Sequence, residues 1–169
     1  MVKPGAVFEG EIKASMKTKG YYNIKLYALI GNSLYRYSGK RPPFDYLCFF
    51  PVLNCAIECK SVKNTTFPLG NISDEQLEEL IKFQASGVNR ISFVLINYRL
   101  GKEYNLCIGL PIKSVLLLKN MGYKSLKLKD LDNALMPQYV LLERLKGSIW
   151  NIDKINSFTF SGSSTPQTH

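Results

Sequence analysis

The chain has 169 residues, the length of one domain, and 46% of them are hydrophobic, enough to bury a core of ordinary size. Its 22 Lys and Arg outnumber 13 Asp and Glu, and the net charge of +9 suits a polyanionic partner, because cationic side chains displace counterions from phosphates. No apolar run reaches the roughly 18 residues of a membrane span, and residues 1–10 lack the apolar stretch of a signal peptide. We therefore expect a cytoplasmic protein without a membrane partner.

The first predicted elements are a helix and a strand. Phe8, Ile12 and Met16 repeat every four residues, which predicts an amphipathic helix over residues 6–17. Residues 22–30 alternate between apolar and polar side chains, which predicts a strand.

Two further strands and a capped helix follow. Residues 45–50 are a short apolar segment and residues 53–61 alternate strictly, so we expect two strands that can pair as a hairpin. Ser73 and Gln76 have the spacing of a capping box, which predicts the start of a helix.

The second half of the chain has weaker signals. An apolar run over 91–97 and a segment over 104–110 predict strands, and residues 112–119 predict a short helix. We also expect a helical turn over 129–135 and a short helix over 139–146.

This order of elements predicts an α/β fold in which helices flank a mixed central β-sheet. We expect a single domain over residues 1–157. Residues 158–169 are rich in Ser, Thr and Gly and predict a flexible C-terminal tail.

Histidine and cysteine chemistry is excluded by position and spacing. The single histidine, His169, ends the predicted tail and cannot be held beside a nucleophile, which removes Ser-His-Asp and Cys-His mechanisms. Cys48, Cys55, Cys59 and Cys107 make no CxxC pair, so a zinc site is disfavoured, and we expect buried thiols.

Carboxylates, a lysine and a metal ion remain as the candidate chemistry. In a strand over 53–61, Glu58 and Lys60 project from the same face. One interpretation is an ordinary surface ion pair. The other adds Asp45 through the hairpin, so that two carboxylates hold Mg²⁺ and the lysine stabilises charge on a phosphate.

Five stretches carry a resemblance to a known family: Gly5-Ala6-Val7-Phe8-Glu9, Phe44-Asp45-Tyr46, Glu58-Cys59-Lys60, Asn64-Thr65-Thr66-Phe67-Pro68-Leu69 and Asp74-Glu75-Gln76-Leu77. With them the chain, from residue 5 to about residue 99, resembles the RecU family of Holliday-junction resolvases. These enzymes belong to the PD-(D/E)xK nucleases, so the resemblance implies a restriction-endonuclease-like core. It also implies that Asp45 and Glu58 are metal ligands for Mg²⁺, for which Mn²⁺ can substitute, and that Lys60 is the catalytic lysine.

The resemblance implies further roles at the edge of the site. Glu9 would approach the metal as another acidic group, although Glu11 is the alternative and either can be a solvent-facing carboxylate. Gln76 would orient water or phosphate, or only complete its helix cap. Thr65 and Thr66 would face DNA, or only shape a turn.

RecU proteins carry a long basic stalk before the catalytic aspartate, and here that interval is only residues 31–44. A reduced stalk and an ordinary basic hairpin tip are equally good interpretations of it. The residues expected to contact DNA are Lys13, Lys17, Arg36, Lys40, Arg41, Lys63, Thr65 and Thr66.

Three hypotheses for function follow. The first is a homodimeric, Mg²⁺-dependent resolvase that nicks two opposing strands of branched DNA in recombination and repair. The second is an endonuclease of the same chemistry that acts on flaps, nicked duplex or foreign DNA. The third is a non-catalytic, DNA-binding accessory protein of recombination.

Overall fold

The computed structural model describes residues 4–26, 42–101 and 105–158. Its centre is a six-stranded sheet in the order β1-β2-β3-β5-β6-β8, in which β3 and β5 pair in parallel and the other neighbours are antiparallel. The strands are β1 (Tyr22–Lys25), β2 (Tyr46–Phe49), β3 (Asn54–Val62), β5 (Arg90–Arg99), β6 (Asn105–Pro111) and β8 (Val140–Leu142).

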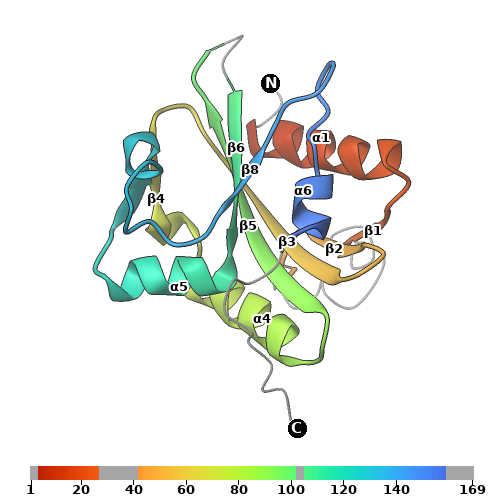
Figure 1. Cartoon of the computed structure of the whole chain (residues 1–169), viewed down its shortest axis with the longest axis horizontal. Helices are drawn as coiled ribbons and strands as arrows, with labels where there is room; N and C mark the ends of the chain where they lie inside the picture. Colours follow the sequence, from red (N-terminus) through yellow and green to blue (C-terminus); the bar gives the residue numbers. More distant parts are fainter. Residues whose placement is uncertain (1–3, 27–41, 102–104, 159–169) are drawn as a thin grey trace, which may run out of the picture.

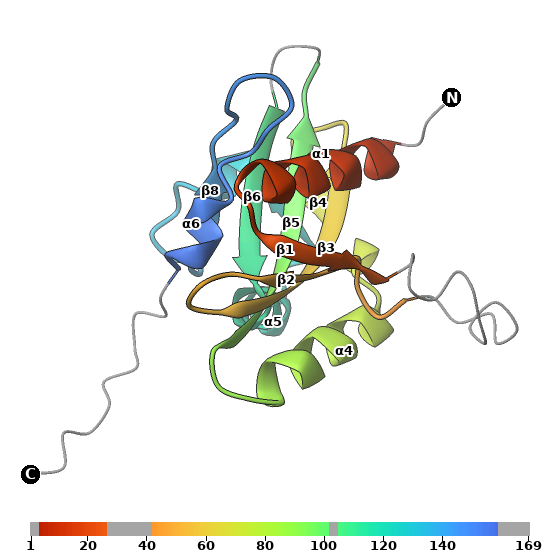
Figure 2. The same cartoon turned by 90° about the vertical axis from the view of Figure 1, so that its right-hand side faces the viewer.

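Helices pack on both faces of this sheet (Figures 1 and 2). Helix α1 (Pro4–Thr18) and the short α6 (Asp153–Asn156) cover one face, and α4 (Asp74–Ala85) and α5 (Ile112–Asn120) cover the other. Phe8, Ile12 and Met16 of α1 are fully buried, as their spacing predicts. The predicted α/β fold with a mixed, helix-flanked sheet is confirmed.

A second, two-stranded sheet lies beside the central one. It pairs β4 (Thr66–Pro68) with β7 (Ser125–Lys127) in antiparallel fashion. The 3-10 helices η1 (Leu69–Asn71) and η2 (Leu128–Asp130) follow these strands.

Two predicted elements differ in the structure. The helix expected over 139–146 is wrong: this segment contains strand β8, in which Val140 and Leu142 are buried and Leu141 is exposed. Pairing with the edge of β6 sets this conformation, so a contact distant in sequence overrides the local pattern. The helical turn expected over 129–135 is reduced to η2.

Other expectations fall partly outside the described residues. The predicted strand over 22–30 is present as β1 up to Lys25; Leu26 is described but lies outside the strand, and residues 27–30 lie outside the described ranges. Residues 159–169, most of the predicted tail, lie outside the described ranges. Across the described ranges, no helix is long and apolar enough to cross a membrane.

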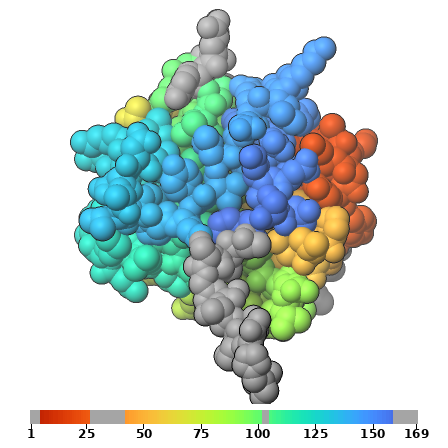
Figure 3. Space-filling model, viewed as in Figure 1, coloured from red at the N-terminus to blue at the C-terminus, as the bar shows by residue number. Residues whose placement is uncertain are grey.

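The C-terminal segment is tied to helix α1, and Figure 3 shows this blue segment lying beside the red helix. The buried Ser15 hydroxyl donates to the Glu11 carbonyl over 2.7 Å and accepts from the Trp150 backbone N–H over 2.8 Å. The Trp150 ring meets the Phe8 ring edge to face, with centroids 6.2 Å apart. One hydroxyl therefore joins the two ends of the fold.

Replacing Ser15 tests this joint. Ser15→Ala removes the acceptor of the buried Trp150 N–H, and we expect the free energy of unfolding to fall by about 1–3 kcal/mol in urea denaturation. Ser157→Ala is the control, because Ser157 is exposed and its hydroxyl bonds only to the nearby Lys154 carbonyl. Equal effects of the two substitutions would contradict the role of the Ser15 hydroxyl in joining helix α1 to the C-terminal segment.

Candidate active site

The hairpin of β2 and β3 brings Asp45 beside Glu58. Asp45 precedes β2, and its N–H donates to the Ile57 carbonyl over 3.1 Å. The Cys59 N–H donates in return to Asp45 Oδ2 over 2.7 Å. One hydrogen bond to its backbone and one to its side chain thus hold the aspartate against the strand that carries Glu58 and Lys60.

Glu58 and Lys60 do not form the surface ion pair that one interpretation of the sequence expects. The Glu58 side chain is only 5% exposed, because β2 and β5 flank its strand and α4 lies over its face. Lys60 Nζ lies 2.9 Å from Glu58 Oε1, and the lysine side chain is 19% exposed. The pair is a largely buried charge pair whose cation reaches toward solvent.

Gln76 connects this pair to the start of helix α4. Its Nε2 donates to Glu58 Oε1 over 2.5 Å, and its Oε1 accepts from Lys60 Nζ over 3.0 Å. The same Oε1 accepts from the Ser73 backbone N–H, while the Ser73 hydroxyl accepts from the Gln76 N–H, each over 3.2 Å. The capping box predicted from the sequence is present, and it fixes which way the amide faces the site.

The two carboxylates disfavour each other's charge. Burial and the neighbouring charge of Glu58 raise the pKa of Asp45 to about 7, against the lowering effect of the Cys59 N–H. Burial also raises the pKa of Glu58, although Lys60 and Gln76 oppose that shift. Two partly buried carboxylates that repel each other are a site that a cation stabilises.

The two carboxylates are enough to hold a Mg²⁺ ion, although they are fewer than most other metal ions require. In the described parts of the chain, no three His, Cys, Asp or Glu side chains are grouped so as to hold a metal ion. Mg²⁺ needs only one or two carboxylates, because it keeps several of its waters. The mutual repulsion of Asp45 and Glu58 matches that requirement.

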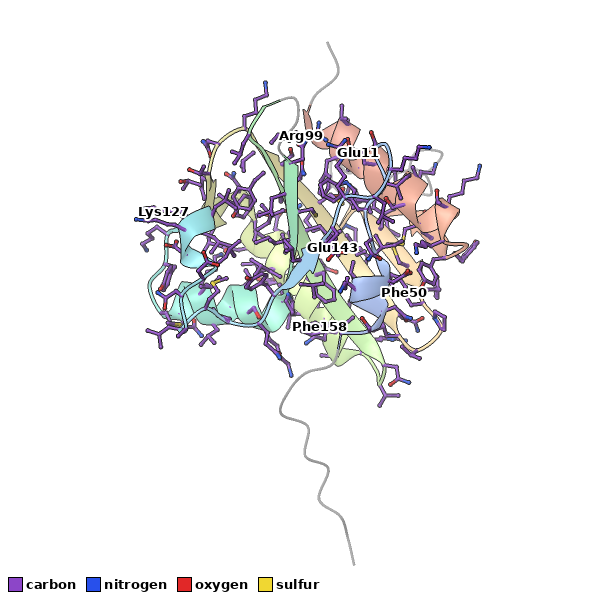
Figure 4. The ribbon with its side chains drawn as sticks, turned by 45° about the horizontal axis from the view of Figure 1, so that its top comes forward. Glu11, Phe50, Arg99, Lys127, Glu143 and Phe158 are labelled. Carbon is purple, nitrogen blue, oxygen red and sulfur yellow. The ribbon has the colours of Figure 1, made fainter. Side chains whose placement is uncertain are left out.

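The structure separates Glu9 from Glu11. Glu9 Oε2 lies 2.7 Å from Lys25 Nζ, and the charge of Glu9 contributes to the raised pKa of Asp45. Glu11 instead faces the C-terminal segment, with Oε2 3.1 Å from Arg99 Nη2 and 3.2 Å from the Trp150 indole nitrogen; Figure 4 shows Glu11 and Arg99 side by side. Glu9 is therefore the glutamate on the side of Asp45.

Sequence reasoning did not single out Lys25. Its only signal was its place on the polar side of an alternating segment, and the contact with Glu9 depends on how α1 lies across β1.

The residues expected to contact DNA are only partly described. Lys13 and Lys17 are exposed on α1, and Lys63 is exposed just after β3. The Thr66 N–H donates to Asn64 Oδ1, and the Thr65 carbonyl accepts from the Leu128 N–H, so both backbones shape the loop and its small sheet. Arg36, Lys40 and Arg41 lie outside the described residues.

An aspartate at the start of one strand and Glu-x-Lys on the next, in a mixed and helix-flanked sheet, are the arrangement typical of nucleases of the PD-(D/E)xK type. Residues 34–145, more than half of the chain, match the family described as Recombination protein U. The chain belongs to the RecU family, as its motifs predict.

Comparison with solved structures gives a more distant likeness. The Holliday junction resolvase Hjc of Archaeoglobus fulgidus is 18% identical, with a TM-score of 0.45 over 65% of this chain and 78% of the other. No curated protein matches the chain.

The amide of Gln76 can be tested apart from its cap. Gln76→Glu keeps an oxygen for the Ser73 N–H and for Lys60, but places a carboxylate against Glu58. We expect nuclease activity to fall roughly 10- to 100-fold, as for other partners of metal-binding side chains. Gln84→Glu is the matched control, because Gln84 lies on the same helix and its Oε1 also accepts a backbone N–H, from Ser92. Equal losses in the two variants would refute a role for the amide.

The raised pKa of Asp45 predicts the pH dependence of stability without metal. The native state keeps a proton between about pH 4 and 7 that the unfolded chain has released, so the free energy of unfolding should fall as the pH rises through this range. Asp45→Asn should remove this fall, leaving the variant more stable than the parent at about pH 8 by on the order of 1–3 kcal/mol.

Urea denaturation in EDTA at several pH values measures this difference. The exposed Asp132→Asn should keep the parental pH dependence. A stability difference between Asp45→Asn and the parent that does not change with pH would contradict the prediction.

Proposed function

We propose that this chain is a Mg²⁺-dependent endonuclease that resolves four-way DNA junctions by paired nicks in opposing strands. Membership of the RecU family supports a DNA-cleaving resolvase. The observation that carries the proposal is the buried Glu58–Lys60–Gln76 network beside Asp45. A purely structural Glu58–Lys60 ion pair would not require Asp45 beside it, whose ionised form is disfavoured by burial and by the charge of Glu58.

Each residue has a role in this proposal. Asp45 and Glu58 would hold the ion, Mg²⁺ or in its place Mn²⁺. When bound, the ion would lower the pKa of a coordinated water and polarise the phosphate. Lys60, held by Glu58 and Gln76, would donate a hydrogen bond to the attacking water or to a phosphate oxygen as negative charge develops. Glu9 would add negative charge beside Asp45 and so favour the cation.

The substrate side of the proposal rests on charge and symmetry. The net charge of +9 favours a nucleic-acid backbone. We propose a homodimer, because two copies related by a two-fold axis would present two sites to the two opposing strands of a junction. Single nicks made in each strand by separate protomers would then be related by that axis.

Cleavage of a synthetic four-way junction tests the function. With Mg²⁺ or Mn²⁺, we expect symmetric nicks in the junction and little cutting of a linear duplex of the same sequence. Asp45→Asn and Glu58→Gln should each lower the rate by at least roughly 100-fold, because each removes an interaction made in the transition state, while junction binding persists. Glu78→Gln, an exposed carboxylate on α4, is the control.

Other outcomes identify other functions. Equal cutting of junction and duplex would replace the resolvase with a general endonuclease of the same chemistry. No cleavage by the unmutated protein with either metal would leave a non-catalytic DNA-binding protein.

A further inference from the structure

Three exposed lysines lie close together in the sequence around strand β7. Lys124, Lys127 and Lys129 lie on and beside β7, and we call them the lysine platform. Residues 119–129 contain four lysines and no acidic residue. Figure 4 shows Lys127 at the outer edge of the molecule, with its side chain directed away from it.

The backbone under the platform is held firmly. Thr66 pairs with Lys127 across the small sheet, so the two side chains share its outer face. The inward residues Phe67 and Leu126 are fully buried, and the Tyr98 hydroxyl of the central sheet donates to the Leu126 carbonyl over 3.3 Å. The cations therefore stand on a fixed surface and not on a free loop.

The charges of the platform are not neutralised within the described part of the chain. There, none of the three lysines lies within ion-pair distance of a carboxylate. The nearest acidic residue in sequence, Asp130, accepts a hydrogen bond from the backbone N–H of Lys127 over 3.0 Å. Its carboxylate is thus engaged by the turn.

A backbone contact connects the platform to the segment that leads into the active site. The Leu69 N–H donates to the Lys124 carbonyl over 3.0 Å, which joins β7 to the 3-10 helix that leads into α4. Helix α5, which precedes the platform in the chain, is joined to α4 in turn, because Lys119 lies 3.4 Å from Asp74, two residues before Gln76. The platform and the network around Glu58 are parts of one packed unit.

We propose that the lysine platform binds the sugar–phosphate backbone of a duplex arm that leads away from the cleaved junction. The inference rests on the proposed function, because it assigns a partner to the same site. Charge complementarity favours a polyanion, and flexible, exposed ammonium groups suit phosphates better than base edges. Residues 63–65 join β3, which carries Glu58 and Lys60, to β4, which pairs with β7, so a short segment connects the active-site strand to the platform.

Binding without cleavage tests the platform independently of catalysis. Lys124, Lys127 and Lys129 are changed together to Ala, and the affinity for a labelled four-way junction is measured in EDTA over a range of salt concentrations. We expect the Kd to rise at least about 10-fold at low salt, and the slope of log K against log salt to lessen by about 2–3, near 0.9 for each lost phosphate contact. Hydroxyl-radical protection should disappear from the duplex arm and remain at the crossover.

Two variants control for charge and for folding. Changing Lys82, Lys146 and Lys154 to Ala removes the same charge elsewhere on the exposed surface and should alter affinity and slope much less. Changing the platform lysines to Arg should retain affinity. All variants should keep the parental melting temperature, since the replaced side chains are exposed.

The outcomes separate this inference from the proposed function. An unchanged Kd and slope, or an equal loss in the control triple variant, would overturn the platform as a DNA surface and favour an acidic protein as its partner. Either result leaves junction cleavage by the unmutated protein unaffected. Failure of that cleavage would overturn the resolvase even if the platform bound duplex arms as expected.

Discussion

The carboxylate of Glu58 is buried between the central sheet and helix α4, and a charge taken out of water must be compensated or neutralised. Strand β3, which carries it, is flanked by β2 and β5, and helix α4 lies over it. Among the residues that the structure describes, Lys60 from its own strand and Gln76 from that helix contact this carboxylate. The capping box sets the direction of the Gln76 amide, and Lys60 and Gln76 together compensate this one buried charge.

A single side chain makes the helix start and the site depend on each other. Gln76 accepts from the Ser73 N–H as part of the helix cap and from Lys60 as part of the site, through the same oxygen. Its amide nitrogen then has one direction left, toward Glu58. The cap stabilises the helix by about 1 kcal/mol. It also orders the polar network, because without it the same side chains could form several alternative hydrogen-bond arrangements.

Local patterns in the sequence predicted the parts of the site that local physics determines. Alternation placed Glu58 and Lys60 on one face of a strand, and the spacing of Ser73 and Gln76 predicted the cap. The burial of Glu58 was not predictable in this way, because it depends on β5 and α4, which come later in the chain. Strand β8 was missed for the same reason, since pairing with β6 decides its conformation.

The choice between Glu9 and Glu11 shows the limit most clearly. Both lie on one helix near its middle, and nothing in their local sequence separates them. Arg99 and Trp150 separate the two, because a salt bridge and a hydrogen bond hold Glu11 on the other side of the helix. Packing of the C-terminal segment thus determines which glutamate remains on the side of Asp45.

The distribution of charge constrains how DNA can approach. Asp45, Glu58 and Glu9 would repel a phosphate at the very place where one is to be cut, and the nearby Lys60 and Lys25 are each already paired with a glutamate. Attraction at longer range must therefore come from exposed cations elsewhere on the surface, whose effect reaches about 10 Å at moderate salt. A divalent ion held by the carboxylates, as proposed, would reverse the sign of the field there. In the proposed function, surface lysines and the metal would therefore act on the same phosphate backbone at different distances, and neither could replace the other.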